Sequence, residues 1–383
     1  MSPLLSEFAR FPDSWEVVPF TQVVKDGTSG NIKIAKQDYL ESGIYPIVDQ
    51  GQNLYGGFTD EQSGLCKSEL PTIIFGDHTR AFKFINEPFV IGADGAKVLE
   101  PKTKKLDKKF LFYYLKQLRI ESAGYSRHFK FLKETYVPVP PLAEQKRIAA
   151  ILDKADAIRQ KRQQTIKLAD EFLRSVFLEM FGDPVTNPKG WEVCELSSCL
   201  DFLTSGSRGW AKYYVEEGSK FIRIQNVGKN KLLLNELAYV NAPDTKEAER
   251  TRVKVNDVLL SITADLGRSA VVTEELSGGH INQHLALLRL KTSKLEPQFL
   301  SALLSSEGAL QQFKAKNKAA VKAGLNFDDI RTFEVYLPPL RTQSKYLAIY
   351  NTAMKNLNKL MIHHDNTEVL FSSLSQKAFS GQL

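Results

Sequence analysis

Arg, Gln, Asn and Ser side chains gather at several turns that lie beside short apolar runs of this chain. Arg, Gln and Asn can form paired hydrogen bonds with guanine and adenine edges, and Ser and Arg beside glycine can approach phosphates closely. A single Arg in a turn is usually only solvated, so the density of these residues is what indicates a DNA-binding surface. The candidates are His78, Thr79, Arg80 and Lys83 in one part of the chain, and Ser205, Ser207, Arg208, Trp210, Arg223, Gln225, Asn226, Asp265 and Arg268 in another.

Residues that could support catalysis are few. Asp94, Glu100 and Lys102 loosely match a nuclease metal site, in which carboxylates hold the metal and a Lys lies nearby. Such a match is common by chance, and Glu100 precedes Pro101 in a Lys-rich stretch. We interpret it as a surface turn.

The histidines also predict no metal site. His280 and His284 would share a face only on a helix, and Gly278-Gly279 before them favours a strand. His363-His364 lies in a long predicted helix, where an interface role is favoured. The sequence contains no Gly-x-Ser-x-Gly elbow, no phosphate-binding glycine loop and no Cys-x-x-Cys pair. We therefore expect no catalytic residue, no metal site and no cofactor in this chain.

Two long helices must position these turns. The first lies in residues 138–182, where three prolines precede about 40 residues without Gly or Pro and Gly182 ends the run. At 1.5 Å per residue this helix would be about 60 Å long. The segment Val137–Gln145 recurs 198 positions later as Val335–Gln343, and a second long helix follows it to Gly381. Ser14–Val17 is likewise repeated as Gly190–Val193.

The repeat predicts four segments: residues 1–137 (module 1), 138–182 (first long helix), 183–337 (module 2) and 338–383 (second long helix). Each long helix has a stripe of residues at alternating steps of four and three, which is typical of coiled coils. Arg159 and Arg162 interrupt the first stripe, and we expect Ile158 to substitute. The alternative is that each helix covers its own module as a core helix. The stripes are Ile148, Leu152, Ala155, Arg159, Arg162, Ile166, Ala169, Leu173, Val176 and Met180, and Tyr346, Tyr350, Ala353, Leu357, Leu360, His364, Thr367, Phe371, Leu374 and Ala378.

Short apolar runs bounded by glycines predict strands in both modules, so the expected class is α+β with two mixed α/β modules. The expected strands are Thr72–Phe75, Ala81–Ile85, Phe89–Ile91, Phe221–Ile224, Val258–Ile262, Ala270–Thr273 and Leu285–Leu290, and the expected helices are Lys108–Ile120 and Pro297–Lys316.

Composition and charge limit the classes of protein to which this chain can belong. The net charge is +7, yet each module carries only +1, so a DNA-binding face would need a local concentration of Lys and Arg. No apolar run approaches the ~20 residues that cross a bilayer, and the N-terminus does not resemble a signal peptide. Three cysteines without metal spacing indicate reduced thiols in a cytoplasmic protein.

Together these features resemble the specificity subunit of type I restriction–modification enzymes over essentially the whole chain. Pro140–Ile148 with its helix is similar to the family's central conserved region, and Pro338–Leu340 with its helix to the distal one. Arg341-Thr342-Gln343-Ser344 departs from the commoner Ala-Glu-Gln-Lys. Four stretches resemble one recurrent type of target-recognition domain: Ser205–Trp210, Phe221–Asn226, Leu259–Arg268 and Ile281–Leu287. Ile73–Arg80 resembles a piece of another type, and Ile281–Leu287 adds Asn282 and Gln283 as candidates.

The resemblance implies that each module reads half of a bipartite, asymmetric DNA site, while antiparallel paired helices set the distance between the halves. It implies two methyltransferase subunits as partners, which carry S-adenosylmethionine and flip an adenine, and restriction subunits that use ATP and Mg²⁺. Two other interpretations stay open: a coiled-coil scaffold that does not bind DNA, and a stand-alone nuclease using Asp94, Glu100 and Lys102.

Overall fold

The computed structural model describes residues 11–93, 95–121, 124, 126–291, 294–316 and 324–383, the side chains of residues 361–366 excepted. The chain forms two compact units: Met1–Gln164 with Met361–Leu383 (unit 1), and Thr165–Leu360 (unit 2). Each long helix is divided between the units, so a unit contains one module and half of both helices. Asp94 and the side chain of His364 lie outside the described residues.

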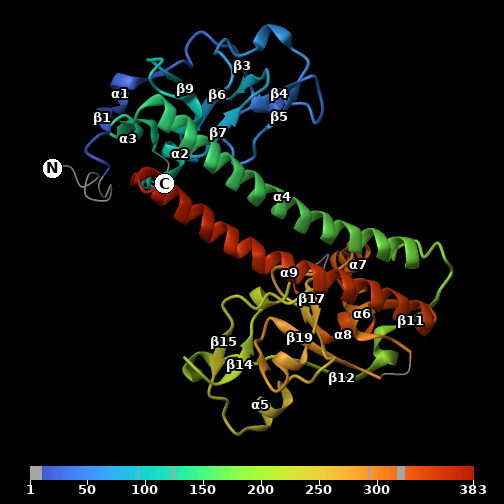
Figure 1. Ribbon diagram of the computed structural model, residues 1–383. Coiled ribbons are helices and arrows are strands. Elements are labelled where there is room, and N and C mark those ends of the chain that lie inside the picture. The colour runs from blue at the N-terminus through green and yellow to red at the C-terminus, as the bar shows by residue number, and fades with distance from the viewer. Residues whose placement is uncertain (1–10, 94, 122–123, 125, 292–293, 317–323) are drawn as a thin grey trace. The chain divides into compact units, whose positions relative to one another are not determined.

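Module 1 contains two four-stranded sheets (Figure 1). Within the second sheet, β4 and β8 run parallel while β4 and β5 form an antiparallel hairpin. The first sheet has the order β2 (Val24–Asp26), β9 (Ala96–Pro101), β6 (Thr72–Gly76) and β7 (Phe82–Ile85), and the second has β3 (Lys33–Ile34), β8 (Val90–Gly92), β4 (Tyr45–Val48) and β5 (Gly57–Thr59).

Module 2 repeats this arrangement with one difference. Its parallel pair is β14–β18, and β14 and β15 form the equivalent hairpin. The edge strand β13 pairs with β15, whereas its counterpart β3 pairs with β8. The first sheet has the order β12 (Leu200–Ser205), β19 (Leu285–Leu290), β16 (Val258–Ser261) and β17 (Ser269–Val271), and the second has β13 (Tyr214–Val215), β15 (Ala238–Val240), β14 (Ser219–Ile222) and β18 (His280–Ile281).

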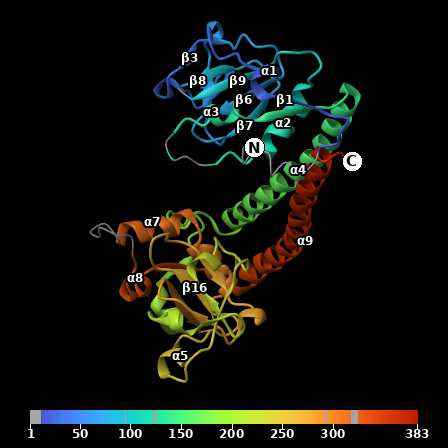
Figure 2. The same cartoon turned by 90° about the vertical axis from the view of Figure 1, so that its left-hand side faces the viewer.

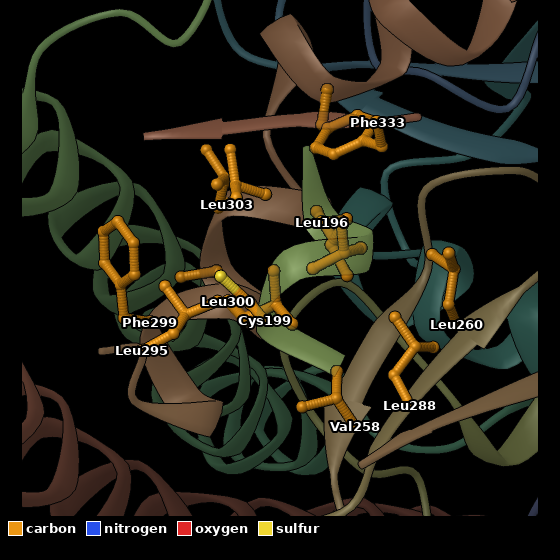
Figure 3. Packing of buried hydrophobic residues seen from close by; sticks show 14 of the residues in the cluster. Leu196, Cys199, Val258, Leu260, Leu288, Leu295, Phe299, Leu300, Leu303 and Phe333 are labelled. Carbon is orange, nitrogen blue, oxygen red and sulfur yellow. The ribbon is translucent and has the colours of Figure 1, made fainter. Parts of the chain in front are cut away.

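One helix covers the first sheet of each module. In module 1 this helix is α2 (Lys108–Gln117), which packs on β6 and β7. In module 2 it is α6 (Pro297–Leu304), and Figure 3 shows its Phe299, Leu300 and Leu303 in one buried cluster with strand residues such as Val258. Burial of these apolar side chains stabilises each module by roughly 25 cal/mol per Å² removed from water.

The predicted strands and the predicted helix Lys108–Ile120 are present, with ends that shift by at most three residues, and Leu285–Leu290 matches at both ends. The expected helix Pro297–Lys316 is wrong as a single element, because α6 ends at Leu304 and α7 (Glu307–Lys316) begins after a two-serine break. Figure 2 shows α7 next to α8 (Phe327–Arg331), and the Lys316 ammonium donates to the Thr332 hydroxyl at 2.8 Å. The remaining short elements are α1 (Phe20–Val23), α3 (Phe129–Leu132), α5 (Lys246–Arg250), β1 (Glu16–Pro19), β10 (Tyr136–Val139), β11 (Glu192–Glu195) and β20 (Glu334–Leu337).

The two long helices are α4 (Leu142–Phe181) and α9 (Leu340–Phe379), each of 40 residues. Gly182 and Gly381 follow their last residues with φ of +82° and +71°. Glycine adopts this left-handed conformation readily, so both residues end their helices as predicted.

The stripe positions of both helices are buried or half-buried wherever their side chains are described. The expectation that Ile158 replaces Arg159 is wrong, because Ile158 is 50% exposed. Arg159 keeps the stripe position by pairing with Asp156 at 2.7 Å and lying over the Phe371 ring at 5.2 Å from its centroid. Its guanidinium also lies 3.4 Å from Glu368 of α9, and Arg162 donates to the Thr367 hydroxyl. Ion pairs of Arg159 and a hydrogen bond of Arg162 thus take the place of apolar contacts at these two positions.

Within unit 1 the helix segments run antiparallel, since Arg147 donates to Leu383 and Arg159 lies near Glu368. Ile148 of α4 and Phe371 of α9 belong to the same core. Within unit 2 the end of α4 and the start of α9 share the other core, where the Phe177 and Tyr346 ring centroids are 5.6 Å apart. The coiled-coil prediction is confirmed, and the alternative holds as well, because both helices also cover the module cores.

A buried glutamine fixes the start of each long helix. The side chain of Gln145 is fully buried, accepts from the Asp107 N–H at 2.8 Å, and donates to the carbonyls of Lys105 and Pro140 at 2.8 and 2.7 Å. Asp107 is the N-cap of α2. This amide therefore ties the helix that covers the sheet to the first turn of α4.

Gln343, 198 positions later, makes the same three contacts. It accepts from the N–H of Glu296, the N-cap of α6, at 2.8 Å, and donates to the carbonyls of Lys294 and Pro338 at 3.1 and 2.7 Å. Only a side-chain amide supplies one acceptor and two donors in this geometry. The repeated Gln is thus explained by structure, although the residues around it differ.

We predict that Gln145→Leu opens the junction between α2 and α4. Leucine leaves two buried carbonyls and one N–H without partners, at about 1–3 kcal/mol for each group. Hydrogen exchange followed by mass spectrometry should show at least tenfold faster exchange at the Asp107 amide. Gln343→Leu should accelerate exchange at the Glu296 amide instead. Gln163→Leu, at an exposed position of α4, should accelerate exchange at neither amide. Unchanged exchange at Asp107 in Gln145→Leu contradicts the role.

Candidate DNA interface

The carboxyl ends of the parallel strands place polar residues together in module 2. Arg223, Gln225 and Asn226 follow β14, and Asn282 and Gln283 follow β18. Because the two strands run in the same direction, these segments leave the sheet at one edge. The Asn282 N–H donates to the Ile222 carbonyl at 3.1 Å, which joins the two segments directly.

The loop after β12 adjoins the same edge, since Ser207 forms a parallel bridge with Asn282. A Cβ at Gly206 would lie 2.1–2.3 Å from backbone atoms of Asn282 and Ile281, so only glycine allows this approach. Arg250 supports the loop from α5: it donates to the Ser205 carbonyl at 2.9 Å, to the Ser207 hydroxyl at 3.4 Å and to the Thr204 hydroxyl. Arg250 was not predicted from the sequence, because it lies in an ordinary charged helix.

The β16–β17 turn is also connected to this edge. Its Thr263 hydroxyl lies 2.7 Å from Nδ1 of His284, directly after Gln283. Arg268 Nε donates to Asp265 Oδ2 at 2.6 Å, and the Ser261 hydroxyl bonds both ends of the turn. All predicted segments of module 2 therefore belong to one connected group of loops.

The side chains of this group differ in exposure. Arg208, Gln225 and Asp265 are exposed, while Ser205, Arg223, Arg268 and Gln283 are half-buried. Ser207, Trp210, Asn226 and Asn282 are buried, so their geometry is that of loop supports. We propose the seven accessible side chains as the surface available to DNA.

Packing and hydrogen bonds explain two of the buried residues. Trp210 packs against Phe221 and His280 with tilted rings, whose centroids are 5.1 and 5.0 Å away. Burial and the nearby Arg252 charge lower the pKa of His280, which favours the neutral form of this buried residue. Asn226 accepts from the Arg223 N–H at 3.0 Å and donates to the Leu233 carbonyl at 3.0 Å.

In module 1 three of the predicted residues, His78, Thr79 and Arg80, occupy the turn between β6 and β7, and Lys83 lies in β7. His78 and Arg80 are exposed and Thr79 is half-buried. Arg80 has φ of +62° and donates to the Ile120 carbonyl at 2.8 Å. Lys83 is different: its side chain is 4% exposed and its ammonium lies 3.4 Å from Asp49. Burial lowers the pKa of Lys83 and Asp49 opposes that shift, so we leave Lys83 out of the proposed contact surface.

Gln50, which the sequence analysis missed, supports this turn. Its side-chain oxygen accepts from the His78 N–H at 3.2 Å, and its carbonyl accepts from the Thr79 hydroxyl. Gln50 follows β4, the counterpart of β14. The sequence signal that could have identified Gln50 was a polar run after a short apolar strand. The same pattern predicted residues 223–226 in module 2.

The carboxylate group that suggested a nuclease has structural partners where it is described. Glu100 lies 2.7 Å from the Lys25 ammonium, and Lys102 donates to the Thr21 carbonyl at 2.6 Å. Among the described residues, no group of three or more His, Cys, Asp or Glu side chains could hold a metal. These contacts favour a surface ion pair over a metal site.

Comparison with known proteins agrees with this arrangement. A family model described as type I restriction modification DNA specificity domain matches residues 12–168 and 188–367. The chain is 23% identical over 417 aligned positions to the EcoBI specificity subunit of Escherichia coli, covering 97% of this chain and 86% of that one. It is 24% identical to the MjaVIII specificity subunit of Methanocaldococcus jannaschii, covering 78% and 76%.

A solved structure shares the fold. The crystal structure of the S subunit of a type I restriction–modification system from M. genitalium superimposes with a TM-score of 0.63 at 16% identity, covering 97% of this chain and 98% of that one. The family model matches twice, once across each module with its following helix, in keeping with the 198-residue repeat. The chain therefore belongs to the type I restriction–modification DNA specificity family.

Proposed function

We propose that this chain is the specificity subunit of a type I restriction–modification system and that each module reads one half of a bipartite, asymmetric DNA site. The repeated connected loops at the carboxyl ends of β4–β8 and β14–β18 carry this proposal. Two different sets of polar residues, on two copies of one scaffold, would read two different half-sites. The chain is a DNA-recognition subunit, and the chemistry belongs to partner subunits.

The proposed partners follow from the family. Two methyltransferase subunits would bind S-adenosylmethionine and methylate an adenine flipped out of the duplex. Restriction subunits would use ATP and Mg²⁺. Among the described residues no helix is long and apolar enough to cross a membrane, and we propose that the complex works in the cytoplasm.

The long helices are proposed to set the distance between half-sites. Each is about 60 Å long at 1.5 Å per residue, and each contributes to both units. A continuous helix has few internal degrees of freedom, so its length would fix the number of unread base pairs. Neither alternative, the scaffold or the nuclease, has an observation that favours it.

We predict that Arg223→Ala, Gln225→Ala and Arg268→Ala each relax one half-site. A well-placed base contact discriminates by about 1–3 kcal/mol, or roughly 5- to 150-fold. Sequencing of methylated adenines in cells that carry the chain with its partners would measure this. Arg331→Ala is the matched control, since Arg331 is an exposed arginine of α8 paired with Asp328. Loss of the complex without any change of motif would contradict the assignment.

We also predict that one heptad inserted in each long helix lengthens the unread gap. The insertions belong at the boundaries between the units, after Gln164 and after Leu360. Seven residues add about 10 Å, or about three base pairs. Seven residues placed after the exposed Glu217, between β13 and β14, should leave the gap unchanged. A methylated motif whose gap is unaltered by the helix insertions would refute the ruler role.

A further inference from the structure

The β4–β5 hairpin of module 1 ends in an exposed loop that the sequence analysis did not select. The strands pair in register from Tyr45 with Thr59 to Ile47 with Gly57, so residues 49–56 form the connection. At its tip Gln52, Asn53 and Leu54 are all exposed, and Leu54 is 47% exposed. All three side chains are therefore accessible to a binding partner.

The base of the loop is held firmly. The Asp49 carboxylate accepts from the Gly51 N–H at 2.8 Å and lies 3.4 Å from the buried Lys83 ammonium. On the other side the Gly56 N–H donates to the Ile47 carbonyl at 2.8 Å, and the Tyr55 hydroxyl bonds Glu87. The tip thus projects from a fixed base, which lowers the entropy lost on binding.

The loop adjoins the predicted turn of module 1. Gln50 bonds both His78 and Thr79, and Gln52 Nε2 lies 3.4 Å from the Thr79 carbonyl. In module 2 the equivalent hairpin, β14–β15, carries Arg223 and Gln225 just after its first strand. The two modules therefore present the same hairpin with different side chains.

The chemistry of the tip is specific. Residues 50–56 read Gln-Gly-Gln-Asn-Leu-Tyr-Gly and contain no charged side chain. The amide of Gln or Asn can accept from N6 of adenine and donate to its N7, and an aliphatic side chain packs on the thymine methyl group. Guanine is preferred by Arg and Lys, which this loop lacks. The nearby Asp49 carboxylate is neutralised by Lys83, which reduces its repulsion of DNA.

We propose that Gln52, Asn53 and Leu54 form the base-reading tip of module 1 and recognise an adenine–thymine pair in the major groove of its half-site. The assignment rests on the proposed function, because it presumes that module 1 reads DNA. Gln50 and the Asp49–Lys83 pair position the tip from beneath.

The test is the adenine methylome of cells that carry the full chain with its methyltransferase partner. The half-site of module 1 is the one that Gln225→Ala in module 2 leaves unchanged. In that half, Gln52→Ala, Asn53→Ala and Leu54→Ala should reduce discrimination at one adenine–thymine pair by about 5- to 150-fold. Gln52→Arg should shift the preference at that pair toward guanine. Gln62→Ala, an exposed glutamine of the 3-10 turn Gln62–Gly64, should change nothing.

The outcomes separate the two proposals. An unchanged motif in all the tip variants overturns the tip assignment, and so does a uniform loss of methylation at every site, which would indicate a phosphate contact or a misfolded module. If a tip variant still methylates only sites that contain the module 2 half-site, misfolding of the complex is excluded. A wild-type methylome without a bipartite motif overturns the proposed function, and this inference with it.

Discussion

The buried amides of Gln145 and Gln343 are the interactions on which each module's attachment to its helix depends. Each amide bonds the N-cap of the helix that covers the sheet, the residue two before that N-cap, and the carbonyl five residues before itself. These groups would otherwise be buried without partners, at a cost of about 1–3 kcal/mol each. The direction in which a long helix leaves its module is therefore fixed by directional bonds as well as by apolar packing.

The proposed role of the helices in setting a distance requires that this joint be fixed. A helix that left its module at a variable angle could not set a distance, however rigid it was. Each helix contributes to the cores of both units. In unit 2 Phe177 of α4 packs beside Tyr346 of α9, and in unit 1 Phe371 of α9 shares a core with Ile148 of α4. Within each unit, the helix segments and the module that carries the candidate recognition loops are thus parts of one packed core.

The repeat, both long helices and most strands were predictable from the sequence, because they depend on local signals: prolines, glycines, apolar periodicity and the 198-residue echo. Side-chain roles were less predictable, since they depend on neighbours distant in the chain. Ile158 was expected on the helix stripe, but Arg159 keeps that place through Glu368, 209 positions away. Lys83 and Trp210 carry groups suited to DNA, yet Asp49 and Phe221 hold them in the interior. Gln50 was overlooked because a residue that supports a loop has no characteristic residue type. Its position just after a strand was the only sequence signal of its role.

The central claim is that one module reads one half-site, and a chain with two copies of module 1 tests it most directly. Module 2 would be replaced between the paired joints, where Glu16 pairs with Val139 and Glu192 pairs with Leu337. The account predicts that adenine methylome sequencing of cells with this chain and its partners yields an inverted repeat of one wild-type half-site. A motif that still contains both original half-sites, or methylation without any motif in a chain that assembles with its partners, would contradict it.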